Sequence, residues 1–222
     1  MHQIPVETNL LADNAAVAQL NRQLFIEHGV YVLNLMSGPG AGKTTLLERT
    51  VEALGPKHRL AVIEGDVQTS ADADRIAQHG VKAIQINTGS SCHLDARMIR
   101  DELGELDLHA LDLLIIENVG NLVCPAEFDL GEHDKVMLLS VTEGHDKPQK
   151  YPVMFHAARL MLLNKVDLLP YVDFELEAAE RAARALNLDL DILRVSAKTE
   201  EGLDEWYAWL KRRIARVKSP AQ

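Results

Sequence analysis

The sequence is poor in cysteine, has no long apolar run and carries few positive charges for its number of negative ones. Two cysteines in 222 residues exclude a disulfide framework and lead us to expect a reducing, cytoplasmic location. No run of 18 apolar residues is present, and the amino-terminal residues show neither the basic nor the apolar region of a secretory signal. The formal net charge of −10 argues against nucleic acid or a membrane as the main partner.

Clustered histidine is also missing, since the nine histidines occur singly. Apolar strand-like runs instead alternate with helix-like runs. This alternation predicts an α/β protein with a mostly parallel sheet of about seven strands and helices on both faces. We expect strands near residues 31–36, 59–64, 82–87, 111–117, 135–141, 159–164 and 191–195. We expect helices near residues 43–54, 70–79, 93–103, 173–187 and 202–216. Segments 122–134 and 142–152 are predicted to be surface loops.

Residues 1–29 are predicted to form a helix that packs on the rest of a single domain spanning residues 1–222. Thr8 or Asn9 is expected to cap this helix, and Gly29 is expected to follow its last turn. Its apolar face is expected to contain Leu10, Val17, Leu20 and Leu24. The last helix shows a similar spacing that predicts core packing rather than a cofactor role, with Leu203, Trp206, Leu210, Ile214 and Val217.

A phosphate-binding loop is the strongest motif. Residues 37–44 read Ser-Gly-Pro-Gly-Ala-Gly-Lys-Thr, between an apolar strand and a helix-forming run. This pattern predicts a P-loop NTPase, although Ser37 stands at the position usually held by glycine. Lys43 is expected to neutralise the β- and γ-phosphates, and the Thr44 hydroxyl to bind Mg²⁺. The predicted nucleotide-binding residues here are Gly38, Gly40, Ala41, Gly42, Lys43, Thr44 and Thr45.

A second motif predicts that the base is guanine. An apolar strand ends in Asn-Lys-Val-Asp at residues 164–167. A carboxylate at Asp167 can accept hydrogen bonds from guanine N1–H and the 2-amino group together, which adenine cannot offer. Ser-Ala-Lys follows a later strand, where a backbone N–H can meet guanine O6. An ordinary turn at 164–167 is the alternative. The predicted base-binding residues are Asn164, Lys165, Asp167, Ser196, Ala197 and Lys198.

Carboxylates follow two further strands. Glu117 ends one strand and Asp66 follows another, so both are candidates to hold Mg²⁺ together with Thr44. Gly120 can offer its N–H to the γ-phosphate. The predicted catalytic residues are Lys43, Asp66 and Glu117. Asp72 and Asp74 are interpreted as first-turn residues favoured by a helix dipole. Because no catalytic glutamine or arginine finger is evident, we expect slow hydrolysis, at roughly 10⁻⁴ to 10⁻² s⁻¹.

Both cysteines fall in loops after strands. Cys92 and His93 are adjacent, and Cys124 lies on the loop beyond Gly120. Two thiolates and an imidazole suit Ni²⁺ or Zn²⁺ rather than Mg²⁺ or Ca²⁺. Three ligands leave a fourth position for water, or for a ligand shared between two copies. Two unrelated small apolar side chains are the alternative. Because the Cys124 loop continues from segment 117–120, movement at the γ-phosphate would reach the metal.

Five segments together resemble the HypB nickel-incorporation GTPases, which help to mature nickel–iron hydrogenases. These segments are residues 37–48, 64–66, 88–95 (Thr-Gly-Ser-Ser-Cys-His-Leu-Asp), 117–129 and 164–167. The resemblance implies a slow GTPase metallochaperone whose nucleotide state controls a nickel or zinc site made of Cys92, His93 and Cys124. It also implies a nucleotide-dependent homodimer with that site at its interface. The implied partners are GTP and GDP, a HypA-type nickel chaperone and a hydrogenase large-subunit precursor.

The chain departs from some members of this family, because it shows neither a Cys-x-x-Cys-Gly-Cys motif nor a histidine-rich run. We therefore expect the metal site of the GTPase domain to act without a separate tight nickel store. Three alternatives remain: a zinc- or nickel-buffering protein, a P-loop small-molecule kinase, or an accessory GTPase of another metalloenzyme such as urease. The urease relatives are expected to carry a Cys-Pro-His segment, whereas Cys92 and His93 are adjacent here.

Overall fold

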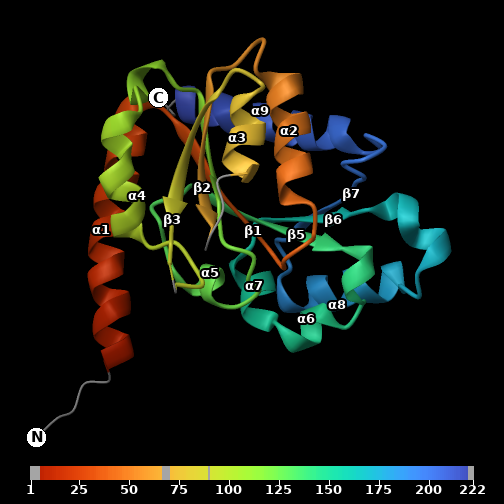
Figure 1. The fold of residues 1–222 in the computed structure, drawn as a ribbon. Helices are drawn as coiled ribbons and strands as arrows, with labels where there is room; N and C mark the ends of the chain where they lie inside the picture. The colour runs from red at the N-terminus through yellow and green to blue at the C-terminus, as the bar shows by residue number, and fades with distance from the viewer. Residues whose placement is uncertain (1–5, 67–70, 90, 220–222) are drawn as a thin grey trace, which may run out of the picture.

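A single parallel sheet organises the chain. The computed structural model describes residues 6–66, 71–89 and 91–219. Seven strands lie in the order β3-β2-β4-β1-β5-β6-β7, and every neighbouring pair is parallel. The strands are β1 (Tyr31–Ser37), β2 (Leu60–Asp66), β3 (Lys82–Asn87), β4 (Leu113–Glu117), β5 (Asp134–Ser140), β6 (Leu160–Asn164) and β7 (Asp191–Arg194). The predicted sheet is confirmed, with each strand close to its expected bounds (Figure 1).

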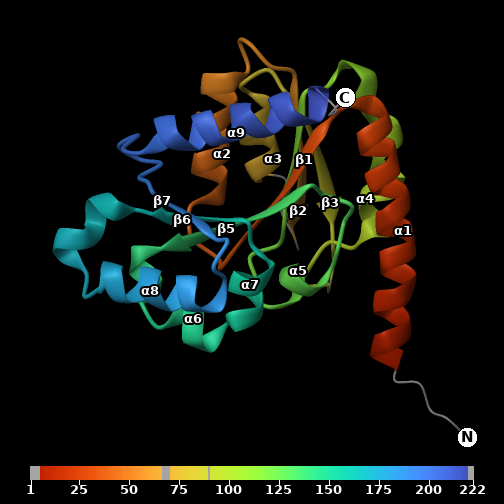
Figure 2. The same ribbon diagram turned by 180° about the vertical axis from the view of Figure 1, so that it is seen from behind.

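Helices cover both faces of the sheet, as predicted (Figures 1 and 2). On one face α2, α3 and α9 enclose a core, and on the other α1 and α4 cover one half while α5, α7 and α8 cover the other. Among the helices in the described ranges, none is long and apolar enough to cross a membrane. The α-helices are α1 (Val6–His28), α2 (Lys43–Leu54), α3 (Ala71–Ala77), α4 (Ala96–Glu102), α5 (Cys124–Glu127), α6 (Lys147–Lys150), α7 (Pro152–Ala157), α8 (Leu176–Leu186) and α9 (Leu203–Lys218). Within the described ranges, the 3₁₀ segments are η1 (Leu103–Glu105), η2 (Leu108–Ala110), η3 (Val141–Glu143) and η4 (Val166–Tyr171).

The amino-terminal helix α1 differs from its prediction in its start and in its buried face. It begins at Val6, so the cap expected at residue 8 or 9 is wrong. Leu10 and Leu20 are 58% and 52% exposed, and the buried face runs instead through Ala18, Asn21 and Phe25. The reason is close packing against a polar loop, where a Cβ on Gly131 would lie 2.7 Å from the Ala18 carbonyl oxygen. A small residue and an amide fit this contact better than leucine does.

The carboxyl end of α1 is as predicted. Gly29 has φ +64, and the Val30 N–H donates to the Phe25 carbonyl at 3.0 Å. This is the hydrogen bond of a Schellman motif, in which a left-handed residue ends the helix. The chain then enters β1 directly.

Two segments predicted as loops contain short helices, so that prediction is partly wrong. Segment 122–134 contains α5 and segment 142–152 contains α6. Each has a proline in its first turn and only four residues, too few to show a helical period in the sequence. The helix α4 also begins later than residue 93, because the Asp95 carboxylate caps it by accepting the Met98 N–H at 2.8 Å. Of the predicted helix 70–79, residue 70 lies outside the described residues, and α3 covers the rest up to Ala77.

The last helix packs as predicted. Leu203, Trp206, Leu210 and Ile214 are buried against α2 and the sheet. The Trp206 indole N–H donates to the Thr50 hydroxyl at 2.9 Å, which connects α9 to α2. The helix that follows the P-loop is thereby fixed from its outer side.

Candidate functional site

The predicted P-loop lies at the carboxyl end of β1, the central strand of the sheet. Gly40 and Gly42 have φ values of +73° and +102°, which residues with a side chain rarely adopt. A Cβ on Gly42 would also lie 2.7 Å from the Asn164 side-chain nitrogen. Helix α2 then begins at Lys43, and no side chain among the described residues caps its first turn. Its amino-terminal N–H groups and dipole suit an anion such as a phosphate.

Lys43 is half-buried at this helix start. Its ammonium group donates to the Ser37 hydroxyl at 2.9 Å, so the serine at the unusual first position of the motif holds the lysine in place. Burial lowers the pKa of Lys43, whereas the carboxylates of Glu117, Asp72 and Glu143 act in the opposite direction. A half-buried cation among acidic groups suits the binding of a negatively charged phosphate chain.

A cavity of about 410 Å³ opens above the loop. Residues 40–45 form one wall, so Ala41, Thr44 and Thr45 lie where the motif predicts, and Lys165 and Glu117 line it as well. Asp72 and Arg75 of α3 also line the cavity. Asp72 is in the first turn of α3, as interpreted, but its position at the cavity was missed.

Arg75 was not among the predicted site residues. Its guanidinium donates to Glu48 at 3.0 and 2.7 Å and to Asp72 at 3.3 Å. The guanidinium is therefore held by acidic side chains at the cavity wall. The signal that could have identified Asp72 and Arg75 was their place on a helix that directly follows the β2 tip.

Two carboxylic acid residues lie side by side near the carboxyl ends of β2 and β4, and one of them, Glu117, lines the cavity. Glu64 of β2 and Glu117 of β4 are paired in register, and each is 3% exposed. Within the part of the chain that the structure describes, the Oε2 atom of each lacks a hydrogen-bond partner. Burial, with nearby acidic groups, raises the pKa of Glu64 to about 7, and burial raises that of Glu117 to about 8.

Sequence reasoning missed Glu64, although it lies in the Glu-Gly-Asp segment that ends β2. An unpartnered pair of buried carboxylate oxygens is the donor set that a hard divalent cation such as Mg²⁺ prefers. The residues present therefore fit the magnesium ion that the P-loop predicts. Asp66 ends β2 beside them, and its carbonyl accepts the Thr88 N–H at 2.9 Å. Asp66 is not among the described residues that line the cavity.

The predicted base-binding loops meet the P-loop. The Asn164 amide donates to the Ala41 carbonyl at 2.8 Å, and its oxygen accepts the Ala197 N–H at 3.0 Å. Lys165, with φ +63, donates to the Gly40 carbonyl at 2.7 Å. Asn164 thus ties all three loops together through its own amide. Its predicted reach to the base edge stays a prediction.

Asp167 lies on η4, the 3₁₀ segment that follows β6. One of its carboxylate oxygens accepts the Ser196 hydroxyl at 2.6 Å, and the Ser196 oxygen accepts the Thr199 N–H at 3.1 Å. Ser196 is buried and Lys198 is exposed. The serine therefore orients the carboxylate that is predicted to read guanine.

Gly38 and Gly120 complete the phosphate end. A Cβ on Gly38 would lie 2.7 Å from the Glu143 carboxylate, and one on Gly120 would lie 3.1 Å from the Pro39 Cα. The loop after β4 therefore lies directly against the P-loop. Gly120 therefore lies beside the P-loop, and its hydrogen bond to the γ-phosphate stays a prediction.

The predicted metal ligands are brought together by two loops. The ligand atoms of Cys92, His93 and Cys124 all lie within 4.8 Å of one another. The two thiol sulfurs are 3.0 Å apart, both cysteines are free, and the His93 Nδ1 atom lies 3.8 Å from the Cys92 sulfur. Burial lowers the pKa of His93, which favours the neutral imidazole that binds metals. The Phe128 ring stacks on His93, with ring centroids 3.8 Å apart.

The hydrogen bond with Cys92, and then burial, raise the pKa of Cys124. A divalent cation would reverse this shift, because a coordinating thiol loses its proton. Two thiolates and one imidazole at these separations suit Ni²⁺ or Zn²⁺.

The loop after β4 joins the metal ligands to the phosphate end. The Asn121 amide donates to the Cys92 carbonyl at 3.3 Å, and Asn118 accepts the Leu94 N–H at 3.1 Å. The same loop contacts Pro39 of the P-loop through Gly120. A single loop therefore contacts both candidate sites.

Comparisons with known proteins agree with this arrangement. The family model "CobW/HypB/UreG, nucleotide-binding domain" matches residues 31–194. The chain is 58% identical over 207 residues to hydrogenase maturation factor HypB of Azotobacter vinelandii, covering 93% of this chain and 68% of that protein. The crystal structure of HypB from Archaeoglobus fulgidus has a TM-score of 0.87 and 41% identity, over 92% of this chain and 100% of that one.

A second solved structure carries a metal. HypB from Helicobacter pylori in complex with nickel is similar to this chain with a TM-score of 0.86 and 39% identity. The match covers 95% of this chain and 99% of that one. The chain therefore belongs to the CobW/HypB/UreG family of nucleotide-binding domains, within the group of hydrogenase maturation factors HypB.

Proposed function

We propose that this chain is a GTP-hydrolysing metallochaperone that assists the insertion of nickel into a nickel–iron hydrogenase. The observation that carries this function is the shared loop after β4, which contacts the P-loop through Gly120 and the metal ligands through Asn121. A change in nucleotide state at one end of that loop alters the position of Cys124 at the other. Nickel is the cargo, and the nucleotide controls its binding and release.

Each nucleotide-binding residue has a distinct task in this proposal. Lys43 and the N–H groups at the start of α2 bind the phosphates, and Asp167 selects guanine. Glu117, Thr44 and Asp66 hold Mg²⁺, with Glu64 as a further carboxylate beside it. The bound Mg²⁺ supplies positive charge that offsets the charge developing on the γ-phosphate. Water attacks the γ-phosphate, and GDP and phosphate leave. We expect this hydrolysis to be slow, because the sequence shows no evident catalytic glutamine or arginine finger.

The nickel site is open. Cys92, His93 and Cys124 supply three ligands, and a fourth comes from water or from a second copy of the chain in the nucleotide-dependent homodimer. An open site releases its metal more readily than a closed four-ligand cage does. The same donors accept Zn²⁺, so zinc competes for this position.

The proposed role also predicts the domain organisation, the cellular location and the partners of the chain. We propose that residues 1–222 act as one GTPase domain with α1 packed on it, in the reducing cytoplasm that two free thiols require. A HypA-type nickel chaperone and the precursor of the hydrogenase large subunit are the proposed protein partners.

A nickel titration in the presence of GDP or a non-hydrolysable GTP analogue tests the proposal. We expect the nickel affinity or stoichiometry to differ between the two nucleotides. Identical curves with bound nickel would favour a metal-buffering protein instead. Failure of the Cys92→Ala variant to lose nickel would show that the metal binds elsewhere.

A further inference from the structure

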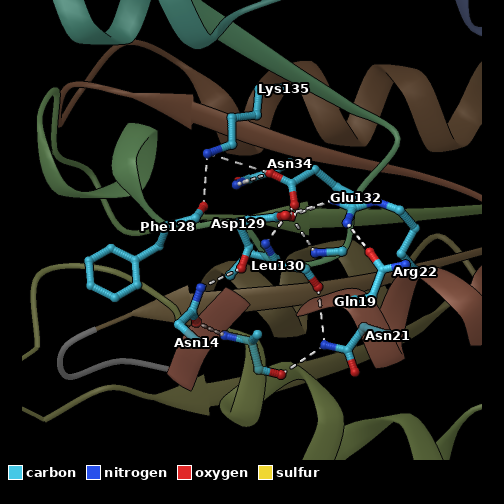
Figure 3. Close-up of polar contacts among 12 residues, drawn as sticks. Asn14, Gln19, Asn21, Arg22, Asn34, Phe128, Asp129, Leu130, Glu132 and Lys135 are labelled. Atoms are coloured by element: carbon cyan, nitrogen blue, oxygen red, sulfur yellow. Dashed lines mark hydrogen bonds and ion pairs between the residues drawn. The ribbon is translucent and has the colours of Figure 1, made fainter. Parts of the chain in front are cut away.

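A buried lysine holds the short helix that carries Cys124. The ammonium group of Lys135, on β5, donates to the carbonyl oxygens of Pro125, Ala126 and Phe128 at 3.3, 2.8 and 2.8 Å. These carbonyls come from the end of α5 and the residue after it, and Figure 3 shows the contact with Phe128. An ammonium group has three N–H donors, so three carbonyls use its full capacity. The Lys135 side chain is only 14% exposed.

The charge of Lys135 is balanced by Glu132, which is 3% exposed. One Glu132 oxygen lies 3.7 Å from the lysine nitrogen and accepts the Asn34 amide at 3.3 Å. The other accepts the Leu130 N–H at 2.7 Å (Figure 3). Burial raises the pKa of Glu132 and lowers that of Lys135, as expected when two charges leave water together.

A second amide continues this chain of hydrogen bonds to the strand that carries Glu117. Asn34 lies in the central strand β1, and its oxygen accepts the amide of Asn118 at 3.2 Å. Asn118 directly follows Glu117 in the sequence. Both asparagines are buried, at 0% and 1% exposed. The contacts therefore run without a gap from the β4 tip to α5.

Both loops that carry candidate metal ligands contact this hydrogen-bond network. On the Cys124 side, Lys135 donates to the carbonyl oxygens of α5 and of Phe128. The ring of Phe128 in turn stacks on His93. On the other side, the Asn118 oxygen accepts the N–H of Leu94, the residue after His93. The ion pair between Arg22 and Asp129 at the outer rim is partly exposed, at 32% and 42% (Figure 3), and the Asp129 carboxylate also acts on Glu132 and Lys135. These buried residues join the two ligand loops, alongside the exposed hydrogen bond from the Asn121 amide to the Cys92 carbonyl.

We infer that Lys135 is a positioning residue for the nickel site, and that the chain Lys135–Glu132–Asn34–Asn118 links the position of Cys124 to the Glu117 strand. This inference rests on the proposed function and specifies how its two sites are coupled. The lysine contacts neither nickel nor nucleotide. It acts by fixing the carbonyl end of α5 relative to β1 and β5.

The experiment compares Lys135→Met, the double variant Lys135→Met/Glu132→Gln and a control, Lys57→Met. Methionine keeps the length of the lysine stem but has no donor. The single variant leaves a buried carboxylate without its cation, so its midpoint of thermal unfolding should fall, whereas the double variant removes both charges and should recover most of that loss. Lys57 is exposed in the turn after α2, so its variant reports the loss of a surface charge alone.

Nickel binding then separates positioning from stability. We expect both Lys135 variants to bind nickel at least about tenfold more weakly, with a weaker thiolate-to-nickel absorption band and a GDP-to-GTP-analogue affinity ratio close to one. The double variant should show these losses although its stability is restored. Recovery of wild-type nickel binding in the double variant would overturn the inference and leave Lys135 a structural residue. If the single variant does not fold, the double variant decides alone.

The two proposals fail separately. A wild-type protein whose nickel affinity ignores the nucleotide would contradict coupled metal delivery. The nickel affinity of the double variant would still decide whether Lys135 positions the site. A wild-type protein with clear coupling that the double variant retains would overturn only the role of Lys135.

Discussion

At the scale of single residues, the paired carboxyl groups at the strand tips have the largest electrostatic consequence. Glu64 and Glu117 lie opposite each other in register, and each is almost fully buried. The half-buried Lys43 is close enough to affect both groups. A buried acid without a counter-ion holds its proton, and a divalent cation displaces it. Nucleotide–magnesium binding should therefore release protons.

The stability of the metal-free protein should fall as pH rises from about 4 to 8. The pKa values of about 7 for Glu64 and about 8 for Glu117 exceed the usual values of unfolded chains, so the folded state holds more protons across this window. At about 1.4 kcal/mol per pKa unit, the two shifts correspond to a loss of up to roughly 8 kcal/mol in the free energy of unfolding. Urea titrations at several pH values would measure it. Substitution of both residues by glutamine should flatten the slope, and an unchanged slope would contradict the assignment.

Asp167→Asn should relax the preference for guanine. The carboxylate is oriented by Ser196 at 2.6 Å and is expected to accept two hydrogen bonds from the base. Replacing charged acceptors with an amide should weaken GTP binding about 10- to 100-fold. Nucleotide competition assays would measure it, with the exposed Asp173→Asn as the matched control. Unchanged GTP selectivity in Asp167→Asn would remove this residue from the base-reading set.

At the scale of elements, α2 connects the nucleotide site to the rest of the core. Its first residue is Lys43, and its outer side is fixed by the hydrogen bond between Thr50 and Trp206 of α9. The helix has no side-chain cap among the described residues, so tertiary packing stabilises it. Loosening α9 is therefore expected to affect the P-loop as well.

Trp206→Ala should destabilise the protein by about 3 to 5 kcal/mol, because it empties a fully buried position and leaves the Thr50 hydroxyl without its donor. Chemical denaturation would measure the loss. Leu188→Ala is the matched control, since Leu188 is 90% exposed and should change stability by less than about 0.5 kcal/mol. Similar effects for both variants would contradict the packing described for α9.

The elements also show how far the sequence could predict the structure. Strands with continuous aliphatic residues and the tryptophan-containing α9 were predicted because burial alone decides their pattern. The exposure of Leu10 and Leu20 on α1 could not be predicted, since it depends on the close contact with Gly131. The helix α5 was missed because a four-residue helix is stabilised by contacts such as those from Lys135, which lie outside its own sequence.

The residues of the candidate site likewise divide into those that the sequence could predict and those that it could not. Motif residues such as Lys43, Asn164 and Cys92 were predicted because their chemistry requires a fixed spacing or neighbour. Glu64 was missed because its importance comes from its register with β4 and from an unpartnered buried oxygen. Asp72 was missed as a cavity residue because its first-turn position already had a simpler explanation.

At the scale of the whole molecule, the three candidate metal ligands, Cys92, His93 and Cys124, are one short of a closed four-coordinate site. We expect the chain to be monomeric with GDP and dimeric with nickel and a non-hydrolysable GTP analogue, if a second copy supplies the missing ligand. Light scattering after size exclusion would measure the mass.

Cys92→Ala should lower the nickel stoichiometry while GTP affinity changes by less than about threefold, because the thiol lies outside the phosphate cavity. Unaltered nickel content in that variant would exclude Cys92 as a ligand.

The strand order also has a consequence for protein synthesis. On one side of β1 lie β4, β2 and β3, which precede residue 118, and on the other lie β5, β6 and β7, which follow residue 133. A chain leaving the ribosome thus exposes the P-loop and both thiols before the base-reading loops at 164–167 and 196–198 exist. A nascent chain can meet metal ions before it can hold guanine. Under the proposed function, nucleotide can control nickel only after the last of these loops, at 196–198, has emerged.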